Sequence, residues 1–142
     1  MLPDYAYFGE SSLGLKELQE GIKDTPAIKT HLEPKLDINF SKEVSTQINA
    51  DYAMMDTSDG LADALFQIAK ASKVKIITNN IYGMFCAEDY KLVATVPEEF
   101  LSKLSNYKLI GRVESYDGNY LQIDNKNFSN YNELGLYDHF GE

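Results

Sequence analysis

The chain has 142 residues, 44% hydrophobic and 12% aromatic, which is enough apolar material for one domain with a core of its own. Its 22 acidic and 13 basic side chains give a formal net charge of -9, and such a surface repels nucleic acid phosphates and anionic membranes, so neither is expected as a partner. The single cysteine, Cys86, excludes a disulfide framework; with no signal-peptide pattern and no apolar run of roughly 20 residues, this predicts a soluble cytoplasmic protein.

The N-terminal third is expected to be mainly helical after a short aromatic strand at residues 5–8. Three leucines behind a serine cap, Ser11 or Ser12, predict a short helix that stops at Gly21. Two prolines within residues 22–37 leave room for one or two helical turns between them. A further helix is predicted near 40–49.

The central third alternates between strands and helices. Residues 51–57 are expected to form a mostly buried strand, followed by a helix over 60–72 and a β-branched strand at 74–78. The helix prediction rests on an apolar face with helical spacing, made of Leu61, Ala64, Leu65, Ile68 and Ala69. A strand at 90–96 then leads to a helix that begins at Pro97 and carries acids in its first turn.

The C-terminal third predicts a strand at 107–115, a turn at Asp117-Gly118, and a second strand at 120–124 that closes a hairpin. The remaining residues, 125–142, show little periodicity, but their apolar side chains suit a tail that docks on the domain. The element order indicates an α+β fold, with a mixed β-sheet flanked by helices.

The stretch AMMDTSDGLADAL, residues 53–65, places Asp56 and Asp59 around Ser58 where a strand becomes a helix. The start of a helix offers unpaired N–H groups and a positive dipole end, and Gly60 permits close backbone approach. Two carboxylates there could hold Mg²⁺ against phosphate oxygens. Equally, Ser58 or Asp59 could simply cap the helix, which is worth about 1 kcal/mol. An EF-hand, a P-loop and a dinucleotide-binding glycine motif are excluded by pattern.

Six segments in the same order resemble the thiamine-monophosphate kinase family. MMDTSDGLADAL is similar to its M-x-D-x-S-D-G-L signature, and CAEDYKLVATVP is similar to its G-G-E-D-Y-E-L segment. The others are YFGESSLGLKELQEG, HLEPKL, YKLIGRV and GLYDHF. These matches extend over nearly the whole chain, so their joint order is far more specific than any one motif.

The resemblance implies a role for each matching residue. Asp56 and Asp59 would coordinate Mg²⁺, and Ser58 would contact the phosphates of ATP, the co-substrate. Glu88 would contact the cationic thiamine moiety and Tyr137 would pack against its ring. No residue is expected to act as a covalent catalyst, because the acceptor is the phosphate of thiamine monophosphate itself. From the residues alone, Glu88 could also be a surface acid, and Tyr137 an aromatic that docks in the core.

The family's fold implies that the chain is a single C-terminal domain over 1–142, like those of aminoimidazole ribonucleotide synthetase-like proteins. Residues 1–21 would be the interdomain link and first helix, and 125–142 a docked tail. An N-terminal kinase domain, the implied partner, is absent, and the full-length protein would be a homodimer. We therefore expect half of an ATP-dependent kinase that is inactive alone.

Two departures from the family pattern leave alternatives open. Cys86 and Ala87 replace two glycines, and the connection between Thr78 and Glu88 is short. The chain could therefore be a non-catalytic or degenerate domain that acts only in association. It could also be the C-terminal domain of a related synthetase.

Overall fold

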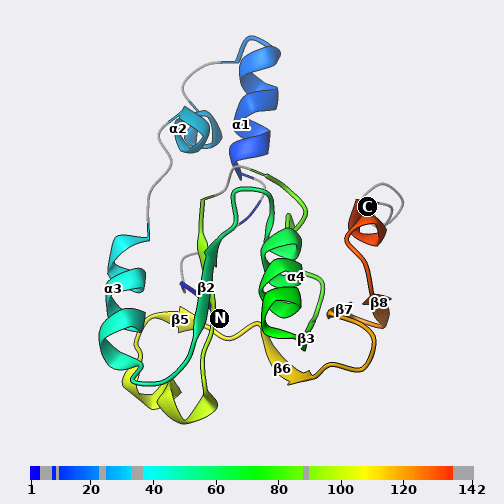
Figure 1. Cartoon of the computed structure of the whole chain (residues 1–142). Helices are drawn as coiled ribbons and strands as arrows, with labels where there is room; N and C mark the ends of the chain where they lie inside the picture. The colour runs from blue at the N-terminus through cyan, green and yellow to red at the C-terminus, as the bar shows by residue number, and fades with distance from the viewer. Residues whose placement is uncertain (4–7, 9, 23–24, 33–36, 88–89, 136–142) are drawn as a thin grey trace.

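The structure, a computed structural model, describes residues 1–3, 8, 10–22, 25–32, 37–87 and 90–135 (Figure 1). The helices are α1 (Glu10–Gln19), α2 (Pro26–Leu32), α3 (Ile38–Gln47), α4 (Leu61–Ser72) and the 3-10 helix η1 (Glu98–Lys103). The strands are β1 (Leu2–Pro3), β2 (Ala53–Asp56), β3 (Val74–Thr78), β4 (Leu92–Thr95), β5 (Tyr107–Lys108), β6 (Gly111–Ser115), β7 (Leu121–Ile123) and β8 (Lys126–Phe128). This confirms the α+β class.

Helix α4 is the centre of the main core. Its apolar residues recur with helical spacing, and Leu61, Ala64 and Leu65 are almost fully buried. The helix packs against β2 of one sheet and β3 of another, so it joins the two sheets. Its start therefore lies where β2 ends, which is where the acidic turn was predicted.

A second, smaller core lies between α3 and the antiparallel pair of β2 and β4. Side chains alternate across β4: Val93 belongs to the core around α4, whereas Ala94 packs with Phe40 and Val44 of α3. The two-stranded sheet thus has a helix on each face (Figure 1). This arrangement holds the end of β2 from both sides.

The predicted hairpin at Asp117-Gly118 is wrong. The four-stranded sheet has the order β6-β3-β7-β8, so β3 lies between β6 and β7. It pairs antiparallel with β6 and parallel with β7, which makes the sheet mixed, as expected. The turn is present, with Gly118 at φ 105, but it carries the chain across the end of β3.

Other boundaries also differ from the sequence prediction. The predicted strand 107–115 divides into β5 and β6, which belong to different sheets. The predicted helix after Pro97 is the 3-10 helix η1. Strand β8 was not predicted; it follows a two-residue turn in which Asp124 has φ 52, and Phe128 is fully buried. An aspartate tolerates this left-handed conformation without glycine.

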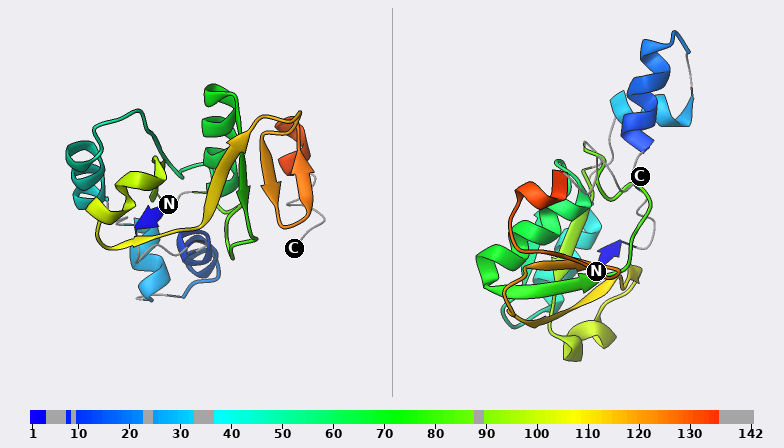
Figure 2. Two further views of the ribbon diagram at one scale, coloured as in Figure 1. Left: turned by 90° about the horizontal axis from the view of Figure 1, so that it is seen from below. Right: turned by 90° about the vertical axis from the view of Figure 1, so that its right-hand side faces the viewer.

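Helices α1 and α2 form a pair that stands away from the two cores, as the right-hand view of Figure 2 shows. Helix α1 begins at Glu10, earlier than the serine cap that was predicted. Gly14 is required inside it, because a Cβ there would lie 2.0 Å from the carbonyl oxygen of Ala27 in α2. The short helix expected within 22–37 is α2, whereas the strand expected at 5–8 falls mostly outside the described residues. No helix in the described ranges has the length and apolar character needed to cross a membrane.

An ion pair ties the turn after β6 to β3 and gives a first prediction. The Lys75 ammonium, almost fully buried, lies 2.8 Å from the half-exposed Asp117 carboxylate. Its hydrogen bond lowers the pKa of Asp117 below the usual range. We expect Asp117→Asn to destabilise the fold at neutral pH, since a buried ammonium loses its partner, and Lys75→Met to cost less, since it removes the desolvated charge as well.

The pH dependence has a definite sign. A carboxyl group whose pKa is lowered by folding stabilises the folded state at pH values above the pKa of the unfolded chain. This contribution is lost as the pH falls through the pKa of the folded state. Urea unfolding of the parent chain and Asp117→Asn should therefore differ at neutral pH and converge in acid. A greater loss for Lys75→Met than for Asp117→Asn would contradict the assignment.

Candidate functional site

The turn after β2 is anchored by Thr57, which is fully buried. Its N–H donates to the carbonyl oxygen of Lys91 at 2.8 Å, and its Oγ1 accepts from the Lys91 N–H at 3.1 Å. The Thr57 carbonyl oxygen accepts from the N–H of Gly60 at 2.8 Å, which closes the turn. The residues on either side of Thr57 are therefore held in place by Lys91, the residue just before β4.

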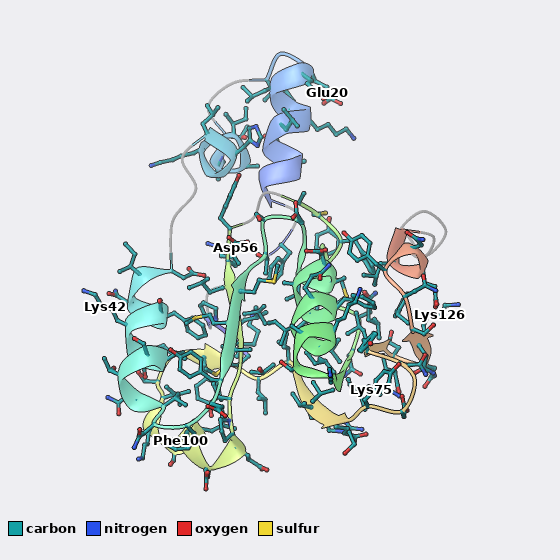
Figure 3. All side chains as sticks on the ribbon, viewed as in Figure 1. Glu20, Lys42, Asp56, Lys75, Phe100 and Lys126 are labelled. Atoms are coloured by element: carbon teal, nitrogen blue, oxygen red, sulfur yellow. The ribbon has the colours of Figure 1, made fainter. Side chains whose placement is uncertain are left out.

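Asp56 and Ser58, the residues that flank Thr57, are brought into direct contact. One oxygen of Asp56, Oδ1, accepts from the Ser58 Oγ at 2.8 Å and from its N–H at 3.3 Å. Asp56 is exposed at the upper end of β2 in the view of Figure 3. Asp59 is also exposed, and no hydrogen bond in the described part of the chain joins it to Asp56 or Ser58. The turn thus presents two carboxylates to solvent.

The alternative that Ser58 or Asp59 caps α4 is wrong. The N-cap residue is Gly60, at φ 105 and ψ 152, and no side chain caps the helix. The N–H of Ala62 in the first turn donates instead to the carbonyl oxygen of Met84, at 2.8 Å. The side chains of Ser58 and Asp59 are therefore not used to start the helix.

Gly60 also brings the loop before Glu88 close to the acidic turn. A Cβ at Gly60 would lie 3.3 Å from the carbonyl oxygen of Met84 and 3.4 Å from that of Cys86. Met84 is buried in the main core, so this loop is packed against the front of α4. Glu88 itself lies outside the described residues.

Sequence reasoning missed Asp63 and Tyr131, which extend the polar cluster. The hydrogen bond between Tyr131 and Asp63 raises the pKa of the Tyr131 hydroxyl, and the negative charges of Asp63 and Asp59 add to the shift. The ring of Tyr131 also meets Phe66 of α4 edge to face, with 5.9 Å between centroids. The segment after β8 therefore lies beside the start of α4. One signal was available in the sequence, since Asp63 lies in the first turn of α4, four residues after Asp59.

The remaining predicted site residue, Tyr137, lies outside the described residues. The chain leading to it is nonetheless fixed up to Leu134, which is 5% exposed and packs in the main core.

A hollow of about 340 Å³ adjoins the turn on the side of α3. It is lined by Asp56, by Tyr90 just before β4, and by residues near the start of α3. A larger hollow of about 480 Å³ lies between β4, η1 and β6 and contains none of the predicted site residues. Because Asp56 belongs to the smaller hollow, that one is relevant to the candidate site.

The donor set suits an open magnesium site. Mg²⁺ takes one or two protein carboxylates and completes its octahedron with waters and phosphate oxygens. Asp56 keeps its second carboxylate oxygen, Oδ2, outside the hydrogen bonds to Ser58, and Asp59 is exposed three residues further along the chain. Within the described ranges no three acidic, histidine or cysteine residues gather to form a closed metal cage. The residues therefore fit a metal shared with a bound phosphate.

Relatives found by sequence comparison share one name, thiamine-monophosphate kinase. The chain is 31% identical to thiamine-monophosphate kinase of Aquifex aeolicus in an alignment of 112 residues, and this match covers 64% of the chain and 36% of the relative. It is 30% identical to the protein of that name from Archaeoglobus fulgidus in an alignment of 148 positions, and this match covers 93% of the chain and 46% of the relative. The chain thus spans less than half the length of these relatives. No protein-family model matches it.

Solved structures show the same likeness. The crystal structure of thiamine monophosphate kinase from Aquifex aeolicus matches 86% of the chain and 49% of its own length, with a TM-score of 0.69 and 28% identity. A structure described as AaThiL complexed with AMPPCP and TMP matches 85% of the chain and 46% of its own length, with a TM-score of 0.70 and 30% identity.

Proposed function

We propose, since the chain belongs to the thiamine-monophosphate kinase family, that it is the C-terminal half of an ATP-dependent kinase that converts thiamine monophosphate to thiamine diphosphate. The observation that carries this proposal is the acidic turn. Asp56 and Ser58 are hydrogen-bonded to each other, and Asp59 follows them as an exposed carboxylate at the front of α4. A related structure holds AMPPCP, an ATP analogue, together with TMP.

In the proposed site, Asp56 and Asp59 would hold magnesium. The Ser58 hydroxyl, which donates to Asp56 in this structure, would turn to donate to a phosphate oxygen of ATP instead. Bound magnesium would neutralise the charge of the transferring phosphoryl group. It would also offset the repulsion between this acidic chain, with its net charge of -9, and two anionic substrates. The protein's own task is to position the two phosphate groups for direct transfer, so no covalent nucleophile is required.

The substrate side of the site is proposed from the family resemblance. Glu88 would face the positively charged thiamine, and Tyr137 would stack on its ring. The close approach of the Met84 and Cys86 carbonyl groups to Gly60 supports the placement of Glu88, because Cys86 precedes it by two residues in the sequence. The burial of Leu134 supports the placement of Tyr137 in the same way.

The chain on its own is proposed to bind Mg-nucleotide without transferring phosphate. The acidic turn supplies two exposed carboxylates, and no closed metal cage forms among the described residues. The relatives carry more than half of their length outside the matched region. We propose that an N-terminal kinase domain provides the rest of the site.

Nucleotide binding tests the acidic turn directly. We expect Mg-AMPPCP to bind the chain, and Asp56→Ala or Asp59→Ala to weaken that binding by about tenfold or more, since each removes a charge-assisted contact. Asp51→Ala is the matched control, because it removes an exposed aspartate just before β2 and changes net charge equally. Calorimetric titration with each variant measures the effect.

The same titration separates the proposal from its alternatives. If Mg-AMPPCP binds the Asp56→Ala and Asp59→Ala variants as tightly as the parent chain, the magnesium assignment is contradicted. Absence of binding even when the unmatched half of a relative is supplied would favour a non-catalytic domain that acts only in association.

A further inference from the structure

Strand β6 is an open edge of the four-stranded sheet. It pairs with β3 along one side, and within the described residues no strand pairs with its other side. All five of its residues are exposed, including Val113 with 46% of its surface accessible. The hollow of about 480 Å³ adjoins it, lined by Gly111, Arg112 and Val113. An uncovered edge with free N–H and C=O groups is a template for another strand.

The sequence of β6 is complementary to itself when two copies run antiparallel. In an antiparallel pair, residues directly opposite each other have their side chains on the same face of the sheet. The two-fold axis that relates two identical strands must therefore pass through a residue paired with its own copy. An axis between two residues would set side chains from opposite faces against each other. Centring the pair on Val113 uses the whole strand. Arg112 then lies opposite Glu114 of the second copy, Glu114 lies opposite the second Arg112, and the two Val113 side chains meet.

The charges are already arranged for this register. Arg112 Nε lies 2.8 Å from Glu114 Oε1 within one chain, and both side chains are largely exposed, at 67% and 49%. In the pair, each guanidinium would lie between two carboxylates of opposite strands. The pair thus gains two favourable cross-strand ion pairs, whereas an edge strand with charges of one sign only would repel its copy.

Apolar side chains extend the surface on both sides of the strand. Leu109 is 61% exposed before β6, and Tyr116 is 47% exposed after it. The other edge of the sheet, β8, has three residues, and one of them, Phe128, is fully buried. Strand β6 therefore offers the longer and more apolar edge for pairing.

We propose that two copies of this chain associate through antiparallel pairing of their β6 strands, centred on Val113, to form one continuous eight-stranded sheet. This association is independent of the proposed kinase function. The small contact and the net charge of -9 on each copy make it a weak, concentration-dependent dimer.

A charge-swap series tests the register. Sedimentation of the 142-residue chain should show a monomer–dimer equilibrium. Arg112→Glu should raise its dissociation constant by about tenfold, because it turns two attractive cross-strand pairs into repulsive ones. Arg112→Glu combined with Glu114→Arg should restore dimerisation to near the parent value. Lys126→Glu on β8 is the matched control, since it changes net charge by the same amount at the opposite edge and should have little effect.

A second measurement does not depend on the variants. Hydrogen exchange at the amides of 111–115 should slow as the concentration of the parent chain rises, while exchange at 126–128 should stay constant. A parent chain that remains monomeric would overturn the proposal. So would a dimer that Lys126→Glu weakens as much as Arg112→Glu, or one that the double swap fails to restore.

Discussion

Replacing Phe66 with alanine is expected to destabilise the domain by about 3–5 kcal/mol, the largest loss for any single side chain of α4. Phe66 is 1% exposed and belongs to the main core. Its ring meets Tyr120 edge to face at 5.5 Å between centroids and Tyr131 at 5.9 Å. The substitution would leave a cavity and also remove two aromatic contacts. Since domains of this size are stable by roughly 5–15 kcal/mol, much of the stability would be lost.

Urea unfolding of three variants checks this expectation. Phe66→Leu retains most of the buried volume and should cost much less than Phe66→Ala. Tyr82→Ala removes an aromatic ring that is 90% exposed and should leave the free energy of unfolding nearly unchanged. Exchange protection of residues 129–135 should also fall in Phe66→Ala, because Tyr131 loses its ring partner. Equal losses for Phe66→Ala and Tyr82→Ala would show that α4 does not organise the core in this way.

Element boundaries were predicted best for the helix and the strand at the centre of the fold. The apolar spacing of α4 and the β-branched run of β3 gave boundaries that the structure confirms within a residue or two. Both elements are packed in the centre of the fold, so local pattern and tertiary packing agree.

Strand pairing could not be predicted in the same way. The turn at Asp117-Gly118 is typical of a hairpin. Yet β3 lies between β6 and β7, the two strands that this turn connects. Turn chemistry fixes a local reversal, whereas partner choice depends on which strand buries its apolar face under α4. The pair between Lys75 and Asp117 holds this arrangement, and no spacing rule indicates it.

At the candidate site, the sequence predicted the residue types but not their contacts. Asp56, Ser58 and Asp59 were predicted as site residues from their order, and the structure adds that Thr57 anchors the turn that carries them to Lys91. The helix-cap alternative was reasonable from spacing and is wrong, because Gly60 adopts a left-handed conformation and the Met84 carbonyl accepts from the first turn. Long-range contacts of this kind leave no periodic signal in a sequence.

Phosphoryl transfer gives the prediction with the largest effect on activity. The chain alone is expected to form no measurable thiamine diphosphate from ATP and thiamine monophosphate. Turnover should appear when the part of a relative that the chain does not match is supplied, either fused or in trans. Asp59→Asn should then lower kcat by about a hundredfold or more, because an interaction that stabilises the transferring phosphoryl group is worth several kcal/mol.

The comparison with Asp51→Asn makes this result specific. Asp51 is exposed and lies before β2, so its amide variant alters charge without touching the turn anchored by Thr57. Asp59→Asn should change kcat more than the KM for thiamine monophosphate, whereas Tyr137→Leu should raise that KM, because stacking on the thiamine ring contributes to ground-state binding. Robust turnover by the isolated chain would show that the two aspartates need no further ligands. An undiminished kcat in the complemented Asp59→Asn variant would remove Asp59 from the site.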